Sequence, residues 1–442
     1  MLELYDTLKK KTVAIDRRGH LNLYTCGPTV YNYAHIGNLR SYVMADLLYR
    51  VLKQDGYAPR WVMNITDVDD KTIKGAIAQS GPAAGVADLR QFTQVYFDEF
   101  LKDLAEVGVL HGEIKFIRVT DVIPQIQEFI VGLANKGYAY KAEDGSTYFS
   151  IEKYQRDFGD YGELVGERFL EGKKVGARVA VDEYEKDNLS DFALWKAWQP
   201  AADGQIFWDH PQLGRGRPGW HIECSVINQI GFGGEATDIH TGGVDLIFPH
   251  HTNEIAQSQA LLGPGNFVRH WFHSEHLLVD GKKMAKSSGN FYTLRDIQDK
   301  GFSGQDLRYL ALSAAYGSRQ NFTFEDLAAA RTARLRYSSP APVEYPETFL
   351  RAVNNNLNLP KAVASAIAAG GLGRVEPVLG LSAAEQADKL PKQVQALAEQ
   401  RRQARQSRDF ARSDELRKQL EAVGYEVMDT PDGQKVRRKI TG

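Results

Sequence analysis

The residues best suited to metal binding lie in distant parts of this 442-residue chain. Residues 249–254 (PHHTNE) place His250 and Glu254 four positions apart, on one face of a predicted helix. The chain has only two cysteines, Cys26 and Cys224, too few for a disulfide scaffold. Two thiolates, an imidazole and a carboxylate are a donor set that suits tetrahedral zinc. Spacing alone leaves four competing ligands open: His251, His221, Glu223 and His240.

A second group of residues suits phosphate binding. Residues 35–38 (HIGN) follow a predicted strand at 20–26 and open a predicted helix that ends near residue 56. A helix N-terminus offers unpaired N–H groups to phosphate oxygens, and Gly27 and Gly37 allow the backbone to approach a nucleotide closely. His35 can donate a hydrogen bond to a phosphate oxygen as pyrophosphate leaves.

A third motif is a lysine-bearing loop, residues 283–287 (KMAKS). Lys283 and Lys286 can neutralise the phosphate charge that develops in a transition state. Each short motif taken alone more often marks an ordinary helix cap or a solvated turn. Their occurrence together, in this order, indicates a nucleotide-dependent enzyme with a metal site.

The elements that must position these residues predict an α/β fold. A strand, a loop, a helix and a second strand near 60–65 are typical of a doubly wound, Rossmann-like parallel sheet with crossover helices. A hairpin is predicted around residues 143–145 (EDG), within an insertion. We expect an all-α C-terminal region. The predicted divisions are 1–111 and 216–265 for the two halves of the catalytic domain, 112–215 for the insertion, 266–320 for the lysine-loop and stem-contact region, 321–395 for a helical domain and 396–442 for the C-terminal region.

The composition is that of a globular protein, with 43% hydrophobic and 25% charged residues and a net charge of −2. This balance excludes a disordered or coiled-coil protein. No apolar run reaches the roughly 20 residues that span a bilayer, and the N-terminus MLELYDTLKK does not resemble a secretory signal. We therefore expect a cytoplasmic enzyme without a membrane partner. Residues 401–442 carry 11 Lys and Arg against 7 Asp and Glu, which favours polyanion contact.

Longer strings around these motifs resemble the cysteinyl-tRNA synthetases, a family of class I aminoacyl-tRNA synthetases. HIGN and KMAKS stand where that family has its HIGH-type and KMSKS motifs, and the likeness extends over nearly the full length. The strings that carry it are YTCGPTVYNYAHIGN (24–38), NITDVDDK (64–71), GRPGWHIECS (216–225), DIHTGGVDLIFPHHTNEIAQS (238–258), HSEHLLVDGKKMAKSSGN (273–290) and RDFARSDELRKQLEAVGYEVMDTPDG (408–433).

The resemblance implies one zinc ion per chain, which grips the sulfur of the substrate cysteine. Matching the strings assigns its ligands as Cys26, Cys224, His250 and Glu254. Because zinc prefers a thiolate to a hydroxyl, serine would be rejected without a separate editing site. The resemblance also implies three residues around the substrate amino acid: Trp220, Thr66 and His240.

For ATP, which we expect to act with Mg²⁺, the resemblance implies two overlapping groups of residues. ATP would convert L-cysteine to cysteinyl-adenylate, and the terminal adenosine of tRNA(Cys) would then accept the cysteinyl group. The catalytic residues would be His35, Lys283 and Lys286. The phosphate and ribose contacts would be His35, Gly27, Gly37, Asn38, Gly243, Asp245, Lys283 and Lys286.

The resemblance further implies tRNA contacts through Arg401, Arg437 and Arg438, in a chain that acts as a monomer. Two departures from the family concern this region. Asparagines at 354–356 replace residues that are commonly acidic, and Val436 stands where the family often has a tryptophan that could stack on an anticodon base. The sequence therefore does not settle how the anticodon is read.

Three alternatives remain at this stage. A cysteine ligase of the mycothiol pathway shares the nucleotide motifs and the zinc site but joins cysteine to an amino-sugar, which gives no reason for the basic segment 397–438. A tRNA-binding module with an inactive catalytic core does not fit the complete HIGN and KMAKS motifs. A zinc hydrolase would need an open metal position and a poised base.

Overall fold

The computed structural model describes residues 1–15, 19–166, 175–179, 189–285, 289–338, 341–381, 391–430 and 433–438. Its centre is a five-stranded sheet in the order β12–β11–β3–β4–β5, with every neighbouring pair parallel. The chain passes from β3 outward to β4 and β5 and later returns to place β11 on the other side of β3. This order confirms the predicted doubly wound sheet and puts its switch point between β3 and β11. The strands are β3 (His20–Thr25), β4 (Ala58–Ile65), β5 (Ile114–Arg118), β11 (Thr237–Gly243) and β12 (Val268–Ser274).

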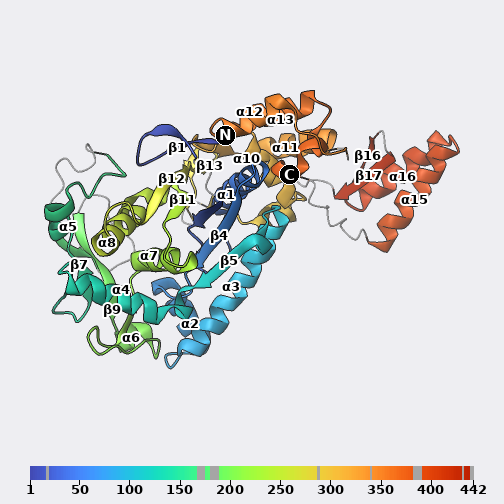
Figure 1. Cartoon of the computed structure of the whole chain (residues 1–442). Helices are drawn as coiled ribbons and strands as arrows, with labels where there is room; N and C mark the ends of the chain where they lie inside the picture. Colours follow the sequence, from blue (N-terminus) through green and yellow to red (C-terminus); the bar gives the residue numbers. More distant parts are fainter. Residues whose placement is uncertain are drawn as a thin grey trace.

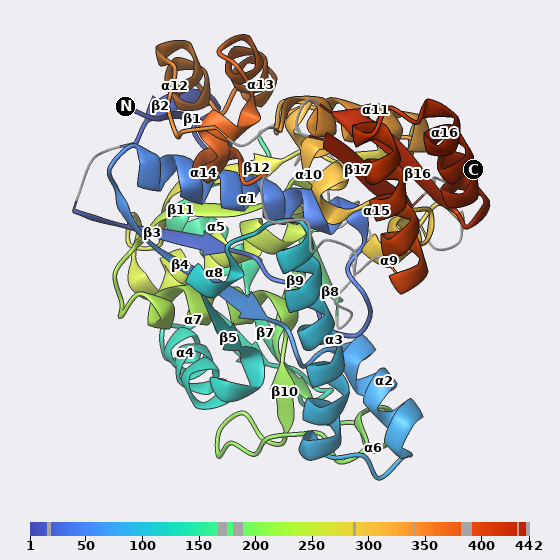
Figure 2. The same cartoon turned by 90° about the vertical axis from the view of Figure 1, so that its right-hand side faces the viewer.

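Helices cover both faces of this sheet (Figures 1 and 2). On one face lies α1, which begins directly after His35 as the sequence predicts. Leu39, Val43 and Leu47 repeat every four positions along α1 and are fully buried, and each contributes roughly 1.5–3 kcal/mol by leaving water. The helices around the sheet are α1 (Ile36–Gln54), α2 (Asp70–Ser80), α3 (Val86–Glu106), α7 (Trp220–Gly231) and α8 (Thr252–Leu262).

The insertion forms a second, mainly antiparallel sheet in the order β10–β9–β7–β6, with β8 parallel to β9. The predicted hairpin is present as β6 and β7. The predicted limits of 112 and 215 are wrong at both ends, because β5 inside them belongs to the parallel sheet and β10 beyond them belongs to the inserted one. The elements are β6 (Ala139–Lys141), β7 (Thr147–Phe149), β8 (Val175–Val179), β9 (Leu189–Ala197), β10 (Gly216–Pro218), α4 (Ile123–Asn135), α5 (Ile151–Phe158) and α6 (Pro200–Asp203).

After the sheet the chain forms a helical region that packs against α1. The second half of the sheet extends through β12 to residue 274, beyond the predicted limit of 265. On α10, Arg308 is fully buried and its Nη2 lies 2.5 Å from Oδ2 of Asp46, which is also fully buried on α1. The elements are α9 (Leu294–Asp299), α10 (Gly304–Leu312), α11 (Phe324–Tyr337), α12 (Glu347–Asn354), α13 (Leu359–Ala368), α14 (Glu376–Leu379), and the short strands β13 (Leu277–Val279), β14 (Lys282–Lys283) and β15 (Gln320–Phe322), with β1 (Glu3–Asp6) and β2 (Lys11–Ala14) at the N-terminus.

The C-terminal module stands apart at the right of Figure 1 and has its own small core of Val394, Leu420 and Val427. It contains helices α15 (Lys392–Gln406) and α16 (Phe410–Ala422), followed by the antiparallel strands β16 (Tyr425–Thr430) and β17 (Gly433–Arg438). The predicted helical C-terminal region is therefore confirmed, and a two-stranded hairpin that the prediction did not include ends it. The residues 431–433 (PDG) are a turn signal that could have located the hairpin. Within the described ranges, no helix combines the length and the apolarity that crossing a membrane requires.

Candidate active site

A cavity of about 280 Å³ lies at the carboxyl ends of β3 and β11, at the switch point of the sheet. Cys26 and Gly27 line it from the end of β3, Gly242 and Gly243 line it from the end of β11, and His35 lines it from the start of α1. Open parallel sheets bind their ligands at this edge, since the loops that follow two diverging strands leave a crevice there. The cavity thus contains part of the predicted metal site and part of the predicted phosphate site.

The four predicted zinc ligands form one buried cluster. The Sγ atoms of Cys26 and Cys224 are 3.8 Å apart, and Nε2 of His250 lies 3.3 Å from Sγ of Cys224. Oε1 of Glu254 lies 3.1 Å from Nε2 of His250 and 3.9 Å from Sγ of Cys26. A tetrahedral zinc ion, with sulfur at about 2.3 Å and nitrogen or oxygen at about 2.0 Å, separates its ligand atoms by about 3.3–3.8 Å. The donor types and their separations therefore fit zinc.

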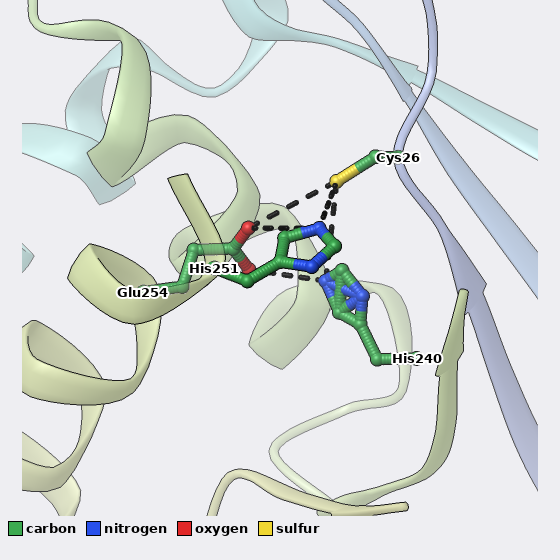
Figure 3. A group of neighbouring side chains, drawn as sticks. All are labelled: Cys26, His240, His251 and Glu254. Atoms are coloured by element: carbon green, nitrogen blue, oxygen red, sulfur yellow. Dashed lines mark hydrogen bonds and ion pairs between the residues drawn. The ribbon is translucent and has the colours of Figure 1, made fainter. Parts of the chain in front are cut away.

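The same cavity edge carries a second metal-compatible group that shares Cys26 and Glu254 with the first (Figure 3). Nε2 of His251 lies 3.3 Å from Sγ of Cys26, and Nε2 of His240 lies 3.1 Å from Oε2 of Glu254. His251 also contacts a further imidazole, because its Nδ1 lies 2.7 Å from Nε2 of His273. Of the alternatives that spacing left open, His240 and His251 therefore lie within reach of a metal.

The electrostatics of this cluster favour a bound cation. Burial, with the neighbouring thiol of Cys224 and the carboxylate of Glu254, raises the pKa of Cys26. Burial alone would raise the pKa of Cys224 too, but hydrogen bonds to Cys26 and His250 lower it. Burial and Cys224 raise the pKa of Glu254 to about 8, whereas for His250 the nearby thiolate and carboxylate overcome burial and raise the pKa to about 10. Without a cation, burial therefore opposes the deprotonation of Cys26 and Glu254 beside Cys224, and a divalent ion would remove this cost and favour the thiolate and carboxylate forms.

Burial keeps the surrounding imidazoles neutral. It lowers the pKa of His221, His240, His251 and His273, and each of the first three is also disfavoured as a cation by neighbouring histidines. Neutral imidazoles can act as metal ligands or as hydrogen-bond partners of metal ligands. His221 takes the second role, because its Nδ1 lies 3.0 Å from Nδ1 of His250.

The predicted amino-acid residues occupy different positions around the cavity. Trp220 lines it, and its ring stacks on that of His250 with a centroid distance of 4.3 Å. Thr66 is buried behind the lining, where its hydroxyl donates to Oε2 of Glu223 at 2.7 Å. Trp220 and Cys26 therefore line the cavity, whereas Thr66 and His240 are buried and are not among the residues that line it.

His35 fixes the entrance of α1. Its Nδ1 accepts a hydrogen bond from the backbone N–H of Asn38 at 3.1 Å and so caps the helix. Burial lowers the pKa of His35 to about 4, opposed by Asp245. The ring is therefore neutral, with its proton on Nε2, and both His35 and Asn38 line the cavity. This arrangement leaves an N–H donor for a phosphate oxygen, as the motif predicts.

Two glycines in the motif region are required by close packing. A Cβ atom on Gly27 would overlap the backbone carbonyl of Asn64, and one on Gly37 would lie 2.5 Å from Cε of Met284. The N–H of Gly27 donates to Oδ1 of Asn64 at 2.7 Å, and the hydroxyl of Tyr24 donates to the same atom. Sequence analysis missed Asn64 as a positioning residue, although it begins the string NITDVDDK.

The remaining predicted ATP residues come from the end of β11 and from the lysine-bearing loop. Gly243, the last residue of β11, and Asp245 line the cavity, and their predicted contact with the ribose stays a prediction. Lys283 is exposed on β14, and its backbone carbonyl accepts a hydrogen bond from Nδ2 of Asn290 at 3.1 Å. Lys286 lies outside the described residues.

The structure changes the view of the predicted tRNA contacts. Arg401 is 1% exposed and its guanidinium pairs with Asp429 at 3.0 Å, so it stabilises the C-terminal module and does not offer a free cation to a phosphate. Arg437 and Arg438 lie on β17, and their side chains are outside the described part of the chain. Val436 packs against the core of the module. Phe410, which sequence analysis missed, is 60% exposed at the start of α16.

Comparison with known proteins gives two family matches. A family described as the tRNA synthetases class I (C) catalytic domain matches residues 12–332, and one described as the cysteinyl-tRNA ligase anticodon binding domain matches residues 387–437. Among similar curated proteins, cysteine–tRNA ligases from Chlamydia caviae and Protochlamydia amoebophila are 42% and 39% identical. Both alignments cover 99% of this chain and 98% of the relative.

Solved structures of other class I synthetases share the fold. Mycobacterium tuberculosis methionyl-tRNA synthetase, in complex with methionyl-adenylate, aligns with a TM-score of 0.52 at 14% identity, covering 92% of this chain and 90% of the other. An Agrobacterium radiobacter LeuRS–tRNA–LeuAMS complex aligns with a TM-score of 0.53 at 11% identity, covering 82% of each chain.

Proposed function

The chain belongs to the cysteine–tRNA ligases, which are class I aminoacyl-tRNA synthetases, and on that premise we propose how its residues join L-cysteine to tRNA(Cys). In the first step the carboxylate of cysteine attacks the α-phosphorus of ATP, which forms cysteinyl-adenylate and releases pyrophosphate. In the second step the terminal adenosine hydroxyl of the tRNA attacks the activated carbonyl, which forms the cysteinyl ester and releases AMP. Neither step forms a covalent bond to the enzyme, so positioning and charge stabilisation supply the catalysis.

The nucleotide lies along the edge between β3 and β11 in this proposal. Nε2–H of His35 and the N–H of Gly37 bind its phosphates, because the N–H groups of Ile36 and Asn38 already donate to Tyr292 and His35. Gly27 lines the cavity beside them. Asp245 and Gly243 face its ribose. Lys283 and Lys286 bring positive charge to the departing pyrophosphate, where Mg²⁺ would share that charge.

The thiol of the substrate is selected at the buried cluster. We assign Cys26, Cys224, His250 and Glu254 as zinc ligands, supported by one observation above others: Cys26 belongs both to this cluster and to the lining of the cavity. When bound, zinc supplies a borderline-soft Lewis acid that prefers a thiolate to a hydroxyl. Serine differs from cysteine mainly in its smaller, harder atom, so pocket size alone could not exclude it.

The C-terminal module is the part of the chain that we propose to contact the anticodon of the tRNA. Phe410 could stack on a nucleotide base in place of the aromatic residue missing at Val436, with Arg437 and Arg438 near phosphates. The mycothiol-pathway alternative has no support, since the curated relatives are cysteine–tRNA ligases and the C-terminal match is to an anticodon-binding domain. We further propose that the enzyme acts as a monomer in the cytoplasm, where tRNA and ATP are available.

Metal analysis combined with cysteine- and serine-dependent ATP–pyrophosphate exchange tests the zinc assignment. The wild-type protein should hold one zinc ion and exchange only with cysteine. Cys224→Ser should lose both properties, whereas the matched variant His251→Gln should keep the zinc. Far-UV circular dichroism confirms that each variant is folded, and His250→Asn replaces Cys224→Ser if the latter is not.

Two results would overturn this assignment. Loss of zinc in His251→Gln but not in Cys224→Ser would give the site to the second group. A wild-type protein that holds no zinc and still prefers cysteine would refute metal recognition altogether. Transfer of labelled cysteine to tRNA but not to an amino-sugar checks the acceptor.

A further inference from the structure

The segment that follows the KMAKS loop is tied to the motif at the start of α1. The backbones of His35 and Thr293 pair in an antiparallel bridge, and the N–H of Ile36 donates to the carbonyl of Tyr292 at 2.9 Å. The ring of Phe291 meets that of His35 edge-on, with a centroid distance of 5.2 Å. The segment that follows the lysine-bearing loop and the proposed phosphate donor are thus neighbours at the mouth of the cavity.

Arg295, two residues further on, holds this junction from outside. Its Cζ lies 3.8 Å from the ring centroid of Tyr33, which is on the loop that leads to His35. Its Nη1 lies 3.3 Å from Oδ1 of Asp103, and its Nη2 forms an ion pair with Glu99. Both carboxylates belong to α3. The guanidinium therefore fastens together the loop before α1, helix α3 and helix α9; we call Tyr33, Glu99, Asp103 and Arg295 the clasp.

The clasp adjoins the substrate space. Tyr33 lines the cavity and contacts Tyr96 edge-on, with ring centroids 5.6 Å apart. Tyr96 and Phe100 also line the cavity. They lie on α3, the helix that carries Glu99 and Asp103. A change at Arg295 is consequently transmitted to the cavity wall both through the ring of Tyr33 and through helix α3.

The burial of the clasp makes it sensitive to the loss of its cation. The side chains of Arg295, Glu99 and Asp103 are 30%, 23% and 5% exposed. Burial raises the pKa of Asp103 to about 6, and Arg295 opposes this rise. Without the guanidinium, Glu99 and Asp103 would lose the cation that ties them to the ring of Tyr33. Lys102 offsets only part of their negative charge, through its contact with Glu99 at 2.6 Å.

We propose that Arg295 is a positioning residue for adenylate formation, which holds the segment after the KMAKS loop against the His35 side of the cavity by bridging Tyr33 to α3. This inference rests on the proposed function. ATP must be gripped from both sides at once, by the α1 entrance and by the lysine loop, and the clasp sets the separation of these two sides. Arg295 acts through Tyr33 and the loop, without contact to the reacting atoms.

Steady-state ATP–pyrophosphate exchange with Arg295→Met, Arg295→Lys and Tyr33→Leu tests this role. We expect Arg295→Met to lower kcat/KM for ATP by about 10-fold or more, with KM for cysteine and zinc content within about twofold of wild type. Arg295→Lys keeps the charge but loses the planar stack, and Tyr33→Leu keeps the ion pairs but loses the ring, so both should give intermediate losses.

The matched control is Arg118→Met. Arg118 lies over the ring of Phe97 on the same helix α3, with Cζ 4.9 Å from the ring centroid, but it does not line the cavity. Wild-type kinetics in this variant and a selective loss for ATP in the Arg295 variants would support the clasp.

The proposal fails if Arg295→Met keeps the wild-type kcat/KM for ATP, even with a lower unfolding midpoint, or if it weakens cysteine and ATP use equally. If Arg295→Met does not fold, wild-type ATP kinetics in both Arg295→Lys and Tyr33→Leu refute it. Absence of cysteine-dependent exchange in the wild-type protein would instead refute the proposed function, so the two failures are distinguishable.

Discussion

The protonation state of His35 gives a quantitative prediction. In the structure Nδ1 of His35 accepts the N–H of Asn38, and burial lowers the pKa of the ring to about 4, from an ordinary value of 6.5. A protonated ring would lose the cap, because Nδ1 would then carry a hydrogen and could not accept. The neutral ring therefore stabilises the fold fully above pH 6.5, and this contribution is lost as the pH falls from 6.5 through 4.

The size of the effect follows from the two pKa values. At pH 5 the His35 ring is almost fully protonated in the unfolded chain and almost fully neutral in the folded protein. This difference lowers the free energy of unfolding by up to about 2 kcal/mol. His35→Asn provides the comparison, since asparagine is a favoured helix cap and does not titrate. Between pH 7.5 and pH 5.0, the free energy of unfolding of the wild type should fall relative to that of His35→Asn by this amount.

Urea unfolding of both proteins at the two pH values measures this difference, and NMR titration of the His35 ring measures its pKa directly. His35→Asn should also slow adenylate formation, because it removes the Nε2–H donor, whereas the wild-type rate should show no transition from His35 between pH 6.5 and pH 8. A His35 pKa near 6.5, or a stability difference that does not change with pH, would refute both the buried cap and the neutral donor.

Two other predictions concern charge on and beside the catalytic domain. Lys286→Ala should lower kcat for adenylate formation by about 10²–10³-fold with little change in cysteine affinity, as expected for a group that stabilises transition-state charge. Single-turnover kinetics measure this, with Lys282→Ala as the control; equal losses in both variants would contradict the role. Arg308→Met should lower the free energy of unfolding by about 3 kcal/mol, because it removes one of the two arginines that pair with the fully buried Asp46. Chemical denaturation measures this change, and a loss below about 1 kcal/mol would show that Arg50 alone satisfies Asp46.

Much of the fold was predictable because its signals are local. The predicted strand at 60–65 lies within β4, and the predicted helix after HIGN is α1. The limits of the insertion were not predictable, because β5 and β10 are short strands whose membership in one sheet or the other depends on their neighbours. The hairpin β16–β17 was not predicted, because the helical pattern that precedes it favoured an all-α C-terminal region.

The candidate site was predicted less evenly. Cys26, Cys224, His250 and Glu254 do lie together, but their spacing could not separate them from His240 and His251, which share the same edge. Arg401 shows the opposite error: its charge indicated a nucleic-acid contact, whereas its burial against Asp429 gives it a structural role. Residue type states what a side chain can bind, and burial decides what it is free to bind.

The sequence by itself determined which chemical groups the protein has and the local elements that carry them: the HIGN helix entrance, the lysine loop, the two thiols and the alternation of strands and helices. Only the tertiary structure decided which imidazoles face the thiols, that His35 is a neutral cap, and that Arg295 joins three separate segments over Tyr33. The physical reason is range. Periodicity and turn chemistry act over a few residues, whereas burial and the contacts between distant segments arise only when the whole chain packs.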